Sequence, residues 1–417
     1  MPIPYLGERL LPETFANGHL RFQKPSMSLP QFNDTEIAFR HLSTPALRQA
    51  SLLFSAVGSP TLTKIGIALT NFALRAKLPV KGIIKRTLFR QFVGGENMAE
   101  AAETAARLAS YGVGVVLDYG VEGAKGEAAF DRAVPEFIKA IRFAAAQSNM
   151  PFIALKVTGF ARFALLEKLH RDEPLSPTEV AEFDRVRKRI FDICEAAHAG
   201  GVRVLIDAEE TWIQGPVDDL ANEAMGRFNK ERVIVFNTFQ LYAHSRLGYL
   251  KDSFTLAQQE GFLLGAKLVR GAYMEKERAR ADAQNYLSPI QTHKEATDRD
   301  YDEAVHFCMD HLDRLAVFIG THNEKSSLLG AQLAEEKGIP HNDPHLWFSQ
   351  LYGMSDNITF NLAAAGYNVV KYLPYGPVED VMPYLMRRAQ ENTSVAGQTS
   401  RELGLIREEL SRRSQKK

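Results

Sequence analysis

The chain has 417 residues, 45% of them hydrophobic, and its 50 basic residues balance 50 acidic ones, so the formal net charge is zero. This balance argues against a nucleic-acid-binding protein, because such proteins need an excess of Lys and Arg to meet phosphate groups. The only cysteines, Cys194 and Cys308, form no CxxC pair, which is typical of a reducing compartment and not of a disulfide-bonded scaffold.

The N-terminal residues MPIPYLGERLLPETF carry Glu8 and Glu13 and lack a basic stretch followed by an apolar one. We therefore predict neither a secretory signal nor a transit peptide. No apolar run approaches the roughly 20 residues that span a bilayer. These features predict a cytoplasmic protein.

The segment 37–95 contains no Asp or Glu. Its basic residues, interleaved with apolar ones at helical spacing, are Arg40, Arg48, Lys64, Arg75, Lys77, Lys81, Lys85, Arg86 and Arg90. Such a stripe suits either a helical lid packed on the core or a helix lying on an anionic membrane surface. Both interpretations stay open from the sequence.

Eight short apolar, β-rich runs follow, separated by helix-like stretches such as 133–147, 177–200 and 324–338. The runs are 112–120, 152–159, 203–210, 233–240, 266–273, 316–323, 345–353 and 367–376. Alternating strands and helices indicate parallel pairing, and eight units favour a closed α/β barrel of the (β/α)8 TIM type. No GxGxxG follows any run, so a doubly wound dinucleotide-binding sheet is disfavoured.

Polar side chains follow the apolar run at every predicted strand end. They are Asp118, Lys156, Asp207, Glu209, Gln240, Lys267, Arg270, Tyr273, Thr321, His322, Asn323, Gln350 and Tyr372. Because the carboxyl ends of barrel strands converge on one mouth, we expect the active site there.

A helix is predicted from Val378, after the last strand. It places Tyr384, Arg387, Arg388 and Glu391 on one face, at spacings of three and four residues. The arginine pair is either solvated on a surface helix or binds a small carboxylate by paired, charge-assisted hydrogen bonds.

The motifs of several other enzyme classes are missing from the sequence. The sequence has no HExxH, no GxSxG and no Walker GK[ST]. His341 and His345 are interpreted as loop histidines, and we expect no metal. A barrel aldolase remains a rival, since Lys156 or Lys267 could form a Schiff base.

Six motifs, in this order and spacing, resemble the proline dehydrogenase family over about residues 95–395. They are LKVTG (155–159), IDAEE (206–210), KLVRGAY (267–273), THN (321–323), LYGM (351–354) and YLPYGPVEDVMPYLMRRAQENT (372–393). The resemblance implies a distorted barrel with additional N-terminal helices, non-covalent FAD, and a last helix laid over the mouth. It also implies oxidation of L-proline to 1-pyrroline-5-carboxylate, the first step of proline catabolism. Electrons then pass to a quinone, and a separate pyrroline-5-carboxylate dehydrogenase acts downstream.

The resemblance also implies roles for single residues. Those expected to bind the substrate are Lys156, Arg387 and Arg388 at the carboxylate, and Tyr273, Leu351, Tyr372 and Tyr384 around the ring. The expected FAD contacts are Ala208, Gln240, Lys267, Arg270, Gly271, Ala272, Thr321 and His322. Asp207 and Lys267 are the expected catalytic pair, with Asp207 bonded to Tyr372, and Glu122 and Glu391 are candidate gate residues.

Lys267 departs from many bacterial relatives, which carry Arg near the flavin, and KLVRGAYMEKER is more similar to the eukaryotic branch. We expect three segments: N-terminal helices over 1–95, the barrel over 96–400 and a basic tail over 401–417. Tyr372, placed over C4 of the substrate ring, predicts a preference for proline over 4-hydroxyproline.

Overall fold

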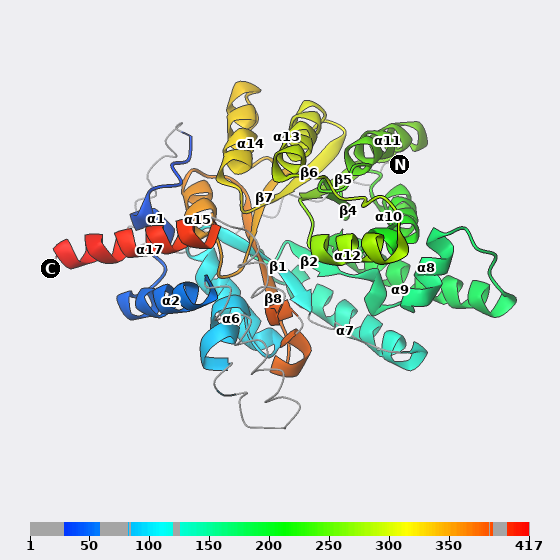
Figure 1. The fold of residues 1–417 in the computed structure, drawn as a ribbon, viewed down its shortest axis with the longest axis horizontal. Helices are drawn as coiled ribbons and strands as arrows, with labels where there is room; N and C mark the ends of the chain where they lie inside the picture. The colour runs from blue at the N-terminus through cyan, green and yellow to red at the C-terminus, as the bar shows by residue number, and fades with distance from the viewer. Residues whose placement is uncertain are drawn as a thin grey trace, which may run out of the picture.

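The computed structural model describes residues 29–58, 82, 85–119, 126–382, 384–386 and 398–416. Its centre is a closed barrel of eight parallel strands paired in sequence order, with the last strand returning to the first (Figure 1). The strands are β1 (Val113–Tyr119), β2 (Phe152–Leu155), β3 (Arg203–Ile206), β4 (Val235–Gln240), β5 (Leu264–Val269), β6 (Leu315–Gly320), β7 (Leu346–Leu351) and β8 (Val369–Tyr375). The predicted (β/α)8 barrel is therefore confirmed.

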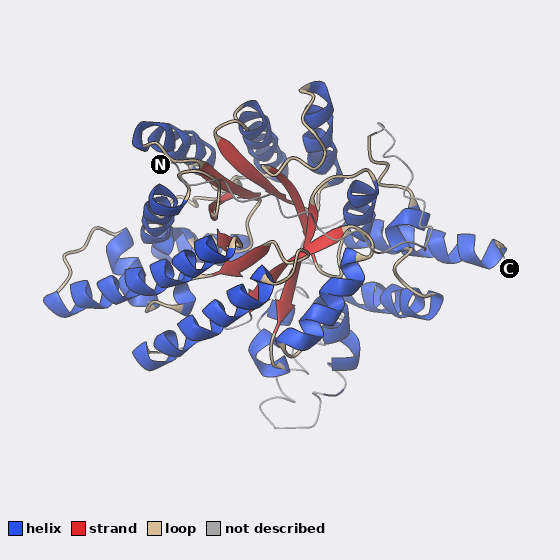
Figure 2. Cartoon of the chain, turned by 180° about the vertical axis from the view of Figure 1, so that it is seen from behind, coloured by secondary structure: helices blue, strands red, loops and turns tan. Residues whose placement is uncertain are grey.

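Helices surround the strands, as the view from behind makes plain (Figure 2). Those that follow β1 to β7 are α7 (Glu127–Ala145), α8 (Phe163–His170), α9 (Pro177–Gly200), α10 (Gln214–Phe228), α11 (Arg246–Glu260), α12 (Met274–Gln284), α13 (Lys294–Asp310), α14 (Glu324–Glu336) and α15 (Asp356–Ala364). Residues 378–382 and 384–386, after β8, are also helical. Strands covered by helices outside and by the barrel core inside are buried on both faces, which explains their continuous apolar runs.

The floor of the barrel is a packed layer of aromatic rings. Phe152 lies at its centre, with its ring centroid 5.1 Å from that of Phe318, 5.8 Å from Phe236 and 4.9 Å from Trp347. All three contacts are edge-to-face, the arrangement that aromatic quadrupoles favour. Because this layer fills the barrel, only the carboxyl ends of the strands above it remain for a site.

Seven of the eight strands end earlier than predicted, and β2, β3 and β5 each end four residues earlier. β2 stops at Leu155, and Val157–Gly159 form a 3-10 turn instead of extending the strand. β3 stops at Ile206, and the chain then leaves the sheet because the backbone N–H of Glu209 donates to the side chain of Gln214. As a result, Lys156 and Asp207 lie just beyond their strands, at the rim of the barrel.

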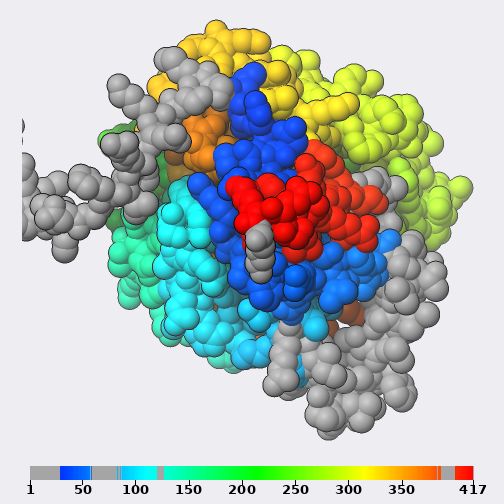
Figure 3. All heavy atoms as spheres, turned by 90° about the vertical axis from the view of Figure 1, so that its left-hand side faces the viewer, coloured from blue at the N-terminus to red at the C-terminus, as the bar shows by residue number. Residues whose placement is uncertain are grey.

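The two ends of the described chain pack together beside the barrel. Helices α1 (Thr35–Phe39) and α2 (Thr44–Val57) contact α17 (Gln398–Gln415), the helix formed by most of the expected basic tail. The space-filling view places α17 directly across α1 and α2 (Figure 3). A second hydrophobic core, separate from the barrel, joins these helices to α5 (Arg90–Phe92) and to residues 378–382 and 384–386 through buried residues such as Phe54, Phe92 and Leu405. A further helix, α6 (Met98–Ala109), leads into β1.

The acid-free segment is described only in part. Phe39, Leu47 and Phe54 are buried, whereas Arg40 and Arg48 are exposed. Residues 59–81, 83 and 84 lie outside the described residues, and with them Lys64, Arg75, Lys77 and Lys81 of the predicted basic stripe. Among the helices of the described ranges, none is both long and apolar enough to cross a membrane.

Candidate active site

Alternation along the strands brings several charged side chains to the inner rim of the barrel. On β1, Val116 lies in the inner core, so Asp118, two residues later, faces the same way. Ala154 and Lys156 have the same relation on β2, and Leu205 and Asp207 on β3. The inner rim therefore carries acidic and basic side chains above an apolar floor.

Asp207 is the centre of this rim. Its Oδ1 accepts a hydrogen bond from Lys267 Nζ at 2.7 Å. Its Oδ2 accepts one from Lys156 Nζ at 3.0 Å and one from Tyr372 Oη at 2.7 Å. The hydrogen bond expected between Asp207 and Tyr372 is thus present. One carboxylate holds two lysines and a tyrosine from three other strands.

Electrostatics keeps this carboxylate ionised. Burial alone would raise the pKa of Asp207, but the ammonium groups of Lys267 and Lys156 hold it well below its usual range. Burial and the charge of Asp207 raise the pKa of Tyr372 well above that of a free phenol. Tyr372 is therefore a neutral hydrogen-bond donor, and Lys267 lies 4.8 Å from its ring centroid.

A second acid, Glu209, lies close to this centre. Its carboxylate accepts hydrogen bonds from the backbone N–H of Thr158 at 3.1 Å and from the Thr158 hydroxyl. Burial raises the pKa of Glu209 to about 7. Gln240 Nε2 donates to the Glu209 carbonyl at 2.7 Å, which fixes the loop after β3 against the end of β4. From the sequence, Glu209 is predicted only as a polar residue at a strand end.

Arg270, after β5, connects three elements. Its guanidinium donates to Asp298 at 2.8 Å, to Thr321 Oγ1 at 2.8 Å and to Ser326 Oγ at 2.9 Å. It also lies over the Tyr301 ring, 4.3 Å from the centroid. Arg270 and Thr321, both expected at the flavin, are therefore brought together and held rigidly.

Gly271 and Ala272 present exposed backbone next to this arginine. Gly271 has φ of +138°, and a Cβ there would come within 2.4 Å of the Tyr242 ring. Only glycine satisfies both constraints. The result is an open stretch of backbone on which a large cofactor can lie close to the chain.

His322 belongs to a chain of contacts that sequence analysis missed. Its Nδ1 lies 2.9 Å from Ser355 Oγ, and the Ser355 backbone N–H donates to Glu402 Oε1 of α17 at 2.9 Å. Ser355 has φ of +51°, a left-handed conformation that a side chain makes costly. Burial, and then the charge of Asp356, raise the pKa of Glu402 to about 8.

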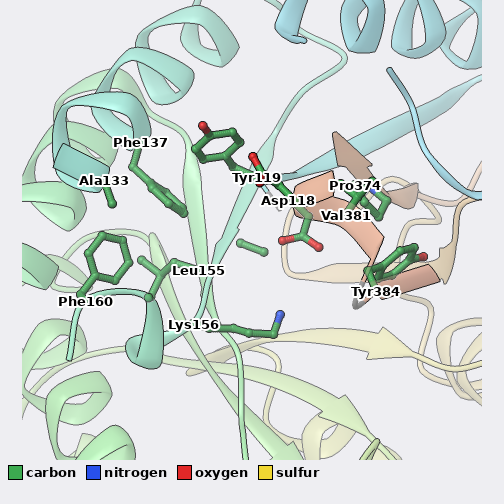
Figure 4. A pocket seen from close by; sticks show the side chains of 13 residues that line it. Asp118, Tyr119, Ala133, Phe137, Leu155, Lys156, Phe160, Pro374, Val381 and Tyr384 are labelled. Carbon is green, nitrogen blue, oxygen red and sulfur yellow. The ribbon is translucent and has the colours of Figure 1, made fainter. Parts of the chain in front are cut away.

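A cavity opens at the rim between β1, β2 and the helical residues after β8 (Figure 4). It is lined by Asp118, Tyr119, Ala133, Phe137, Ala154, Leu155, Lys156, Gly159, Phe160, Pro374, Asp380, Val381 and Tyr384. Asp118, Lys156 and Tyr384 point into the same space from three different elements. The expected substrate residues Lys156 and Tyr384 thus share one cavity.

The other expected residues are distributed around the mouth or lie beyond the description. Ala208 is buried next to Asp207, Leu351 ends β7, and Tyr273 is half-buried just before α12. The rest of the carboxylate and gate sets, Glu122, Arg387, Arg388 and Glu391, lie outside the described residues. Across the described residues, no group of three or more His, Cys, Asp or Glu could hold a metal ion.

The chain matches the family model described as proline dehydrogenase over residues 101–401. It is 34% identical to the carbapenem antibiotics biosynthesis protein CarD of Pectobacterium carotovorum, over 87% of this chain and 95% of that protein. It is 42% identical to the mitochondrial proline dehydrogenase 1 of Caenorhabditis elegans, over 57% of this chain but only 40% of the relative. Among solved structures, proline utilization A from Bdellovibrio bacteriovorus has the same fold, with a TM-score of 0.68, 20% identity and coverage of 88% of this chain and 38% of that one.

Proposed function

The chain belongs to the proline dehydrogenase family, and from that premise we propose that it oxidises L-proline to 1-pyrroline-5-carboxylate with bound FAD and a quinone as electron acceptor. The observation that carries this proposal is the Asp207 cluster, which holds Lys156, Lys267 and Tyr372 at the mouth of the barrel. Proline is a compact zwitterion, and a buried site for it must present fixed charges of both signs. The cluster does so at the place where barrel enzymes carry their active sites.

The residues of the mouth fit a flavin dinucleotide. Lys267 and Arg270 supply positive charge, while Gln240, Thr321 and His322 supply polar contacts. The exposed backbone at Gly271 and Ala272 gives a large anionic group room to approach. We propose that these residues, with Ala208, hold the cofactor, which when bound supplies the two-electron acceptor.

We propose that Lys156, together with Arg387 and Arg388, binds the substrate carboxylate, and that Tyr273, Leu351, Tyr372 and Tyr384 enclose the ring. Asp207 would orient Lys156 without taking the proton, because its carboxylate stays ionised among two lysines. Lys267, fixed by Asp207, would stabilise negative charge that develops on the cofactor. Glu122 and Glu391 are proposed to gate the cavity. Cations around one carboxylate also favour loss of the ring-nitrogen proton.

We propose three segments for the chain: N-terminal helices over 1–95, the catalytic barrel over 96–400 and a C-terminal segment over 401–417. A cytoplasmic location with peripheral membrane contact through residues 37–95 would bring the site to a membrane quinone. Support comes from α2, where Leu52 is 74% exposed one turn from the exposed Arg48. We further propose a separate pyrroline-5-carboxylate dehydrogenase as the enzyme that consumes the product.

An absorption spectrum of the purified protein, recorded before and after anaerobic addition of L-proline, tests cofactor and substrate together. We expect a flavin band that bleaches with L-proline. A flavin band that does not respond would overturn the substrate, and a colourless protein inactivated by borohydride would favour the Schiff-base aldolase at Lys156 or Lys267.

A further inference from the structure

Glu209 is a buried acid beside the Asp207 cluster, and the mechanism above gives it no role. Its carboxylate accepts hydrogen bonds from the Thr158 backbone N–H at 3.1 Å through one oxygen and from the Thr158 hydroxyl through the other. Thr158 belongs to the turn Val157–Gly159, which directly follows Lys156. A buried carboxylate that uses both oxygens on one residue of this turn holds the turn in place.

These contacts continue the register of β2 and β3. The backbone pairs between the two strands join residues that are 51 apart in the chain. The ion pair of Lys156 with Asp207 keeps this separation, and so do the hydrogen bonds to Thr158. Side chains therefore carry on the pairing where the backbone ladder stops. The loop after β3 holds the ammonium group of Lys156 through Asp207, and it holds the turn after Lys156 through Glu209.

The backbone of Glu209 is itself fixed on both sides. Its N–H donates to Gln214 Oε1 at 2.9 Å, and its carbonyl accepts from Gln240 Nε2 at 2.7 Å. Gln214 Nε2 in turn donates to Asp218, whose carboxylate accepts two hydrogen bonds from Arg246, at 2.7 Å and 2.9 Å. All five of these residues are buried. A buried and fully paired network of this kind is rigid, so Glu209 can hold the turn in one position.

The turn needs such support because it is short. Val157–Gly159 form a single 3-10 turn, in which the Gly159 N–H donates to the Lys156 carbonyl at 3.0 Å. Such turns have poorer hydrogen-bond geometry than an α-helix. If this turn opened, the Lys156 backbone would move with it. The ammonium group would then leave the position from which it points into the cavity (Figure 4).

We propose that Glu209 is a positioning residue for substrate binding, which holds the turn Val157–Gly159 so that Lys156 meets the substrate carboxylate. This inference rests on the proposed function and adds to it a residue that acts through Lys156. The role depends on hydrogen bonds to the turn and not on the charge of Glu209. Glutamine keeps an acceptor oxygen for the Thr158 N–H, and its amide can donate to the Thr158 hydroxyl. Glu209→Gln should therefore retain the function that Glu209→Ala loses.

The test measures kcat and KM for L-proline in the FAD-loaded Glu209→Ala variant. We expect KM to rise about tenfold while kcat stays within about threefold, because the fit of the substrate carboxylate is what changes. KM in Glu209→Gln should stay within about threefold of that of the unmodified protein. The matched control is Glu210→Ala, which removes the neighbouring acid, whose carboxylate pairs with Lys276 of α12. It should change KM by less than about threefold.

A double-mutant cycle separates this role from a role in the cavity wall, to which Gly159 and Phe160 contribute. If Glu209 acts through Lys156, Glu209→Ala should change KM by less than about twofold in the Lys156→Met background. An equal rise in KM with and without Lys156 would mean that the turn serves as a wall, and it would overturn the inference. A tenfold rise in Glu209→Gln, or the same effect in Glu210→Ala, would overturn it as well.

If Glu209→Ala does not fold, Thr158→Val removes the hydroxyl bond and keeps the branched shape of the side chain. KM should then rise about fourfold, and this rise should vanish in the Lys156→Met background. An unchanged KM, or a rise that persists without Lys156, contradicts the inference. Failure of the unmodified protein to oxidise L-proline overturns the proposed function itself. An active protein without the coupled effect overturns only the role of Glu209.

Discussion

Tyr372 is the residue at which substrate selectivity can be argued most directly. Its hydroxyl donates to Asp207 at 2.7 Å, and Lys267 lies 4.8 Å from the centre of its ring. These two contacts fix the ring at the mouth of the barrel, where it cannot move aside for a larger substrate at low cost. If Tyr372 lies over C4 of the substrate ring, as proposed, a hydroxyl on C4 would clash with this fixed ring.

Replacing Tyr372 with Ser should therefore narrow the preference for L-proline over 4-hydroxy-L-proline, by roughly tenfold or more in the ratio of kcat/KM values. Steady-state kinetics with both substrates measures the ratio. Tyr372→Phe is the matched control, because it removes the hydrogen bond to Asp207 but keeps the ring. Selectivity in Tyr372→Ser equal to that of the unmodified protein would exclude this role of the ring.

Lys156 carries a second prediction at the scale of one residue. It is a positive charge at the cavity, and Asp207 orients it through a 3.0 Å ion pair. Lys156→Met keeps most of the side-chain length and removes the charge. We expect the KM for L-proline to rise between about 30-fold and 150-fold, as for the loss of a charge-assisted contact of about 2–3 kcal/mol. A KM within about threefold of the original value would contradict the assignment.

At the scale of the element, α17 reaches the mouth of the barrel through Glu402. The carboxylate accepts the backbone N–H of Ser355, whose hydroxyl lies 2.9 Å from His322. Close by, Asp356 of α15 pairs with Lys371 of β8 at 2.8 Å, and it lies 3.2 Å from His41, just after α1. Glu402 of α17 therefore holds the left-handed turn at Ser355, next to His322, which is a proposed FAD contact.

Glu402 predicts a pH dependence of stability. Its pKa is raised from 4.5 to about 8 in the folded protein, so the folded state binds more protons than the unfolded state between these two values. Stability contributed by protonated Glu402 is fully present below about pH 4.5 and is lost as the pH rises through about 8. Glu402→Gln cannot ionise and should lose less stability between about pH 5 and about pH 9 than the unmodified protein.

Urea unfolding at several pH values measures this difference, and Glu408→Gln, an exposed change on the same helix, is the control. Asp356 does not interfere, because its pKa is lowered and its contribution is lost only in acid, below the window of Glu402. Parallel pH profiles for Glu402→Gln and the unmodified protein would contradict the prediction.

The helices and strands also show which features of this fold can be predicted from the sequence. All eight strands were predictable, because burial on both faces leaves continuous apolar runs. The end of β3 was not, since it depends on one hydrogen bond from the Glu209 backbone to Gln214. Glu402 was missed for a similar reason. In the sequence it cannot be distinguished from the exposed Glu408 of the same helix, and its partner Ser355 lies 47 residues away.

At the scale of the whole molecule, the two ends of the described chain are joined by one buried carboxylate. Glu409 of α17 has a side chain that is 0% exposed, and it accepts hydrogen bonds from Thr35 at 3.1 Å and from Arg412 and Arg413 at 2.7 Å. Arg413 also donates to the carbonyls of Phe39 and Leu42, at the end of α1. Charged groups thus fix α17 to α1, beside the second hydrophobic core.

This arrangement predicts that Glu409→Gln destabilises the protein by about 2 kcal/mol. This loss of stability should be smaller than the 3–5 kcal/mol typical of breaking a fully buried ion pair. Arg412 and Arg413 are both partly exposed, so water can solvate them in the variant. The free energy of unfolding in urea measures the loss, and Glu408→Gln on the exposed side of α17 should change it by less than about 0.5 kcal/mol.

If α17 holds Ser355 and His322 through Glu402, Glu409→Gln should also release FAD faster on dilution, as followed by the rise in flavin fluorescence. A loss of stability without faster release would mean that α17 supports the fold independently of the mouth, and equal effects in Glu408→Gln would show that the buried carboxylate is not the joint between the two ends.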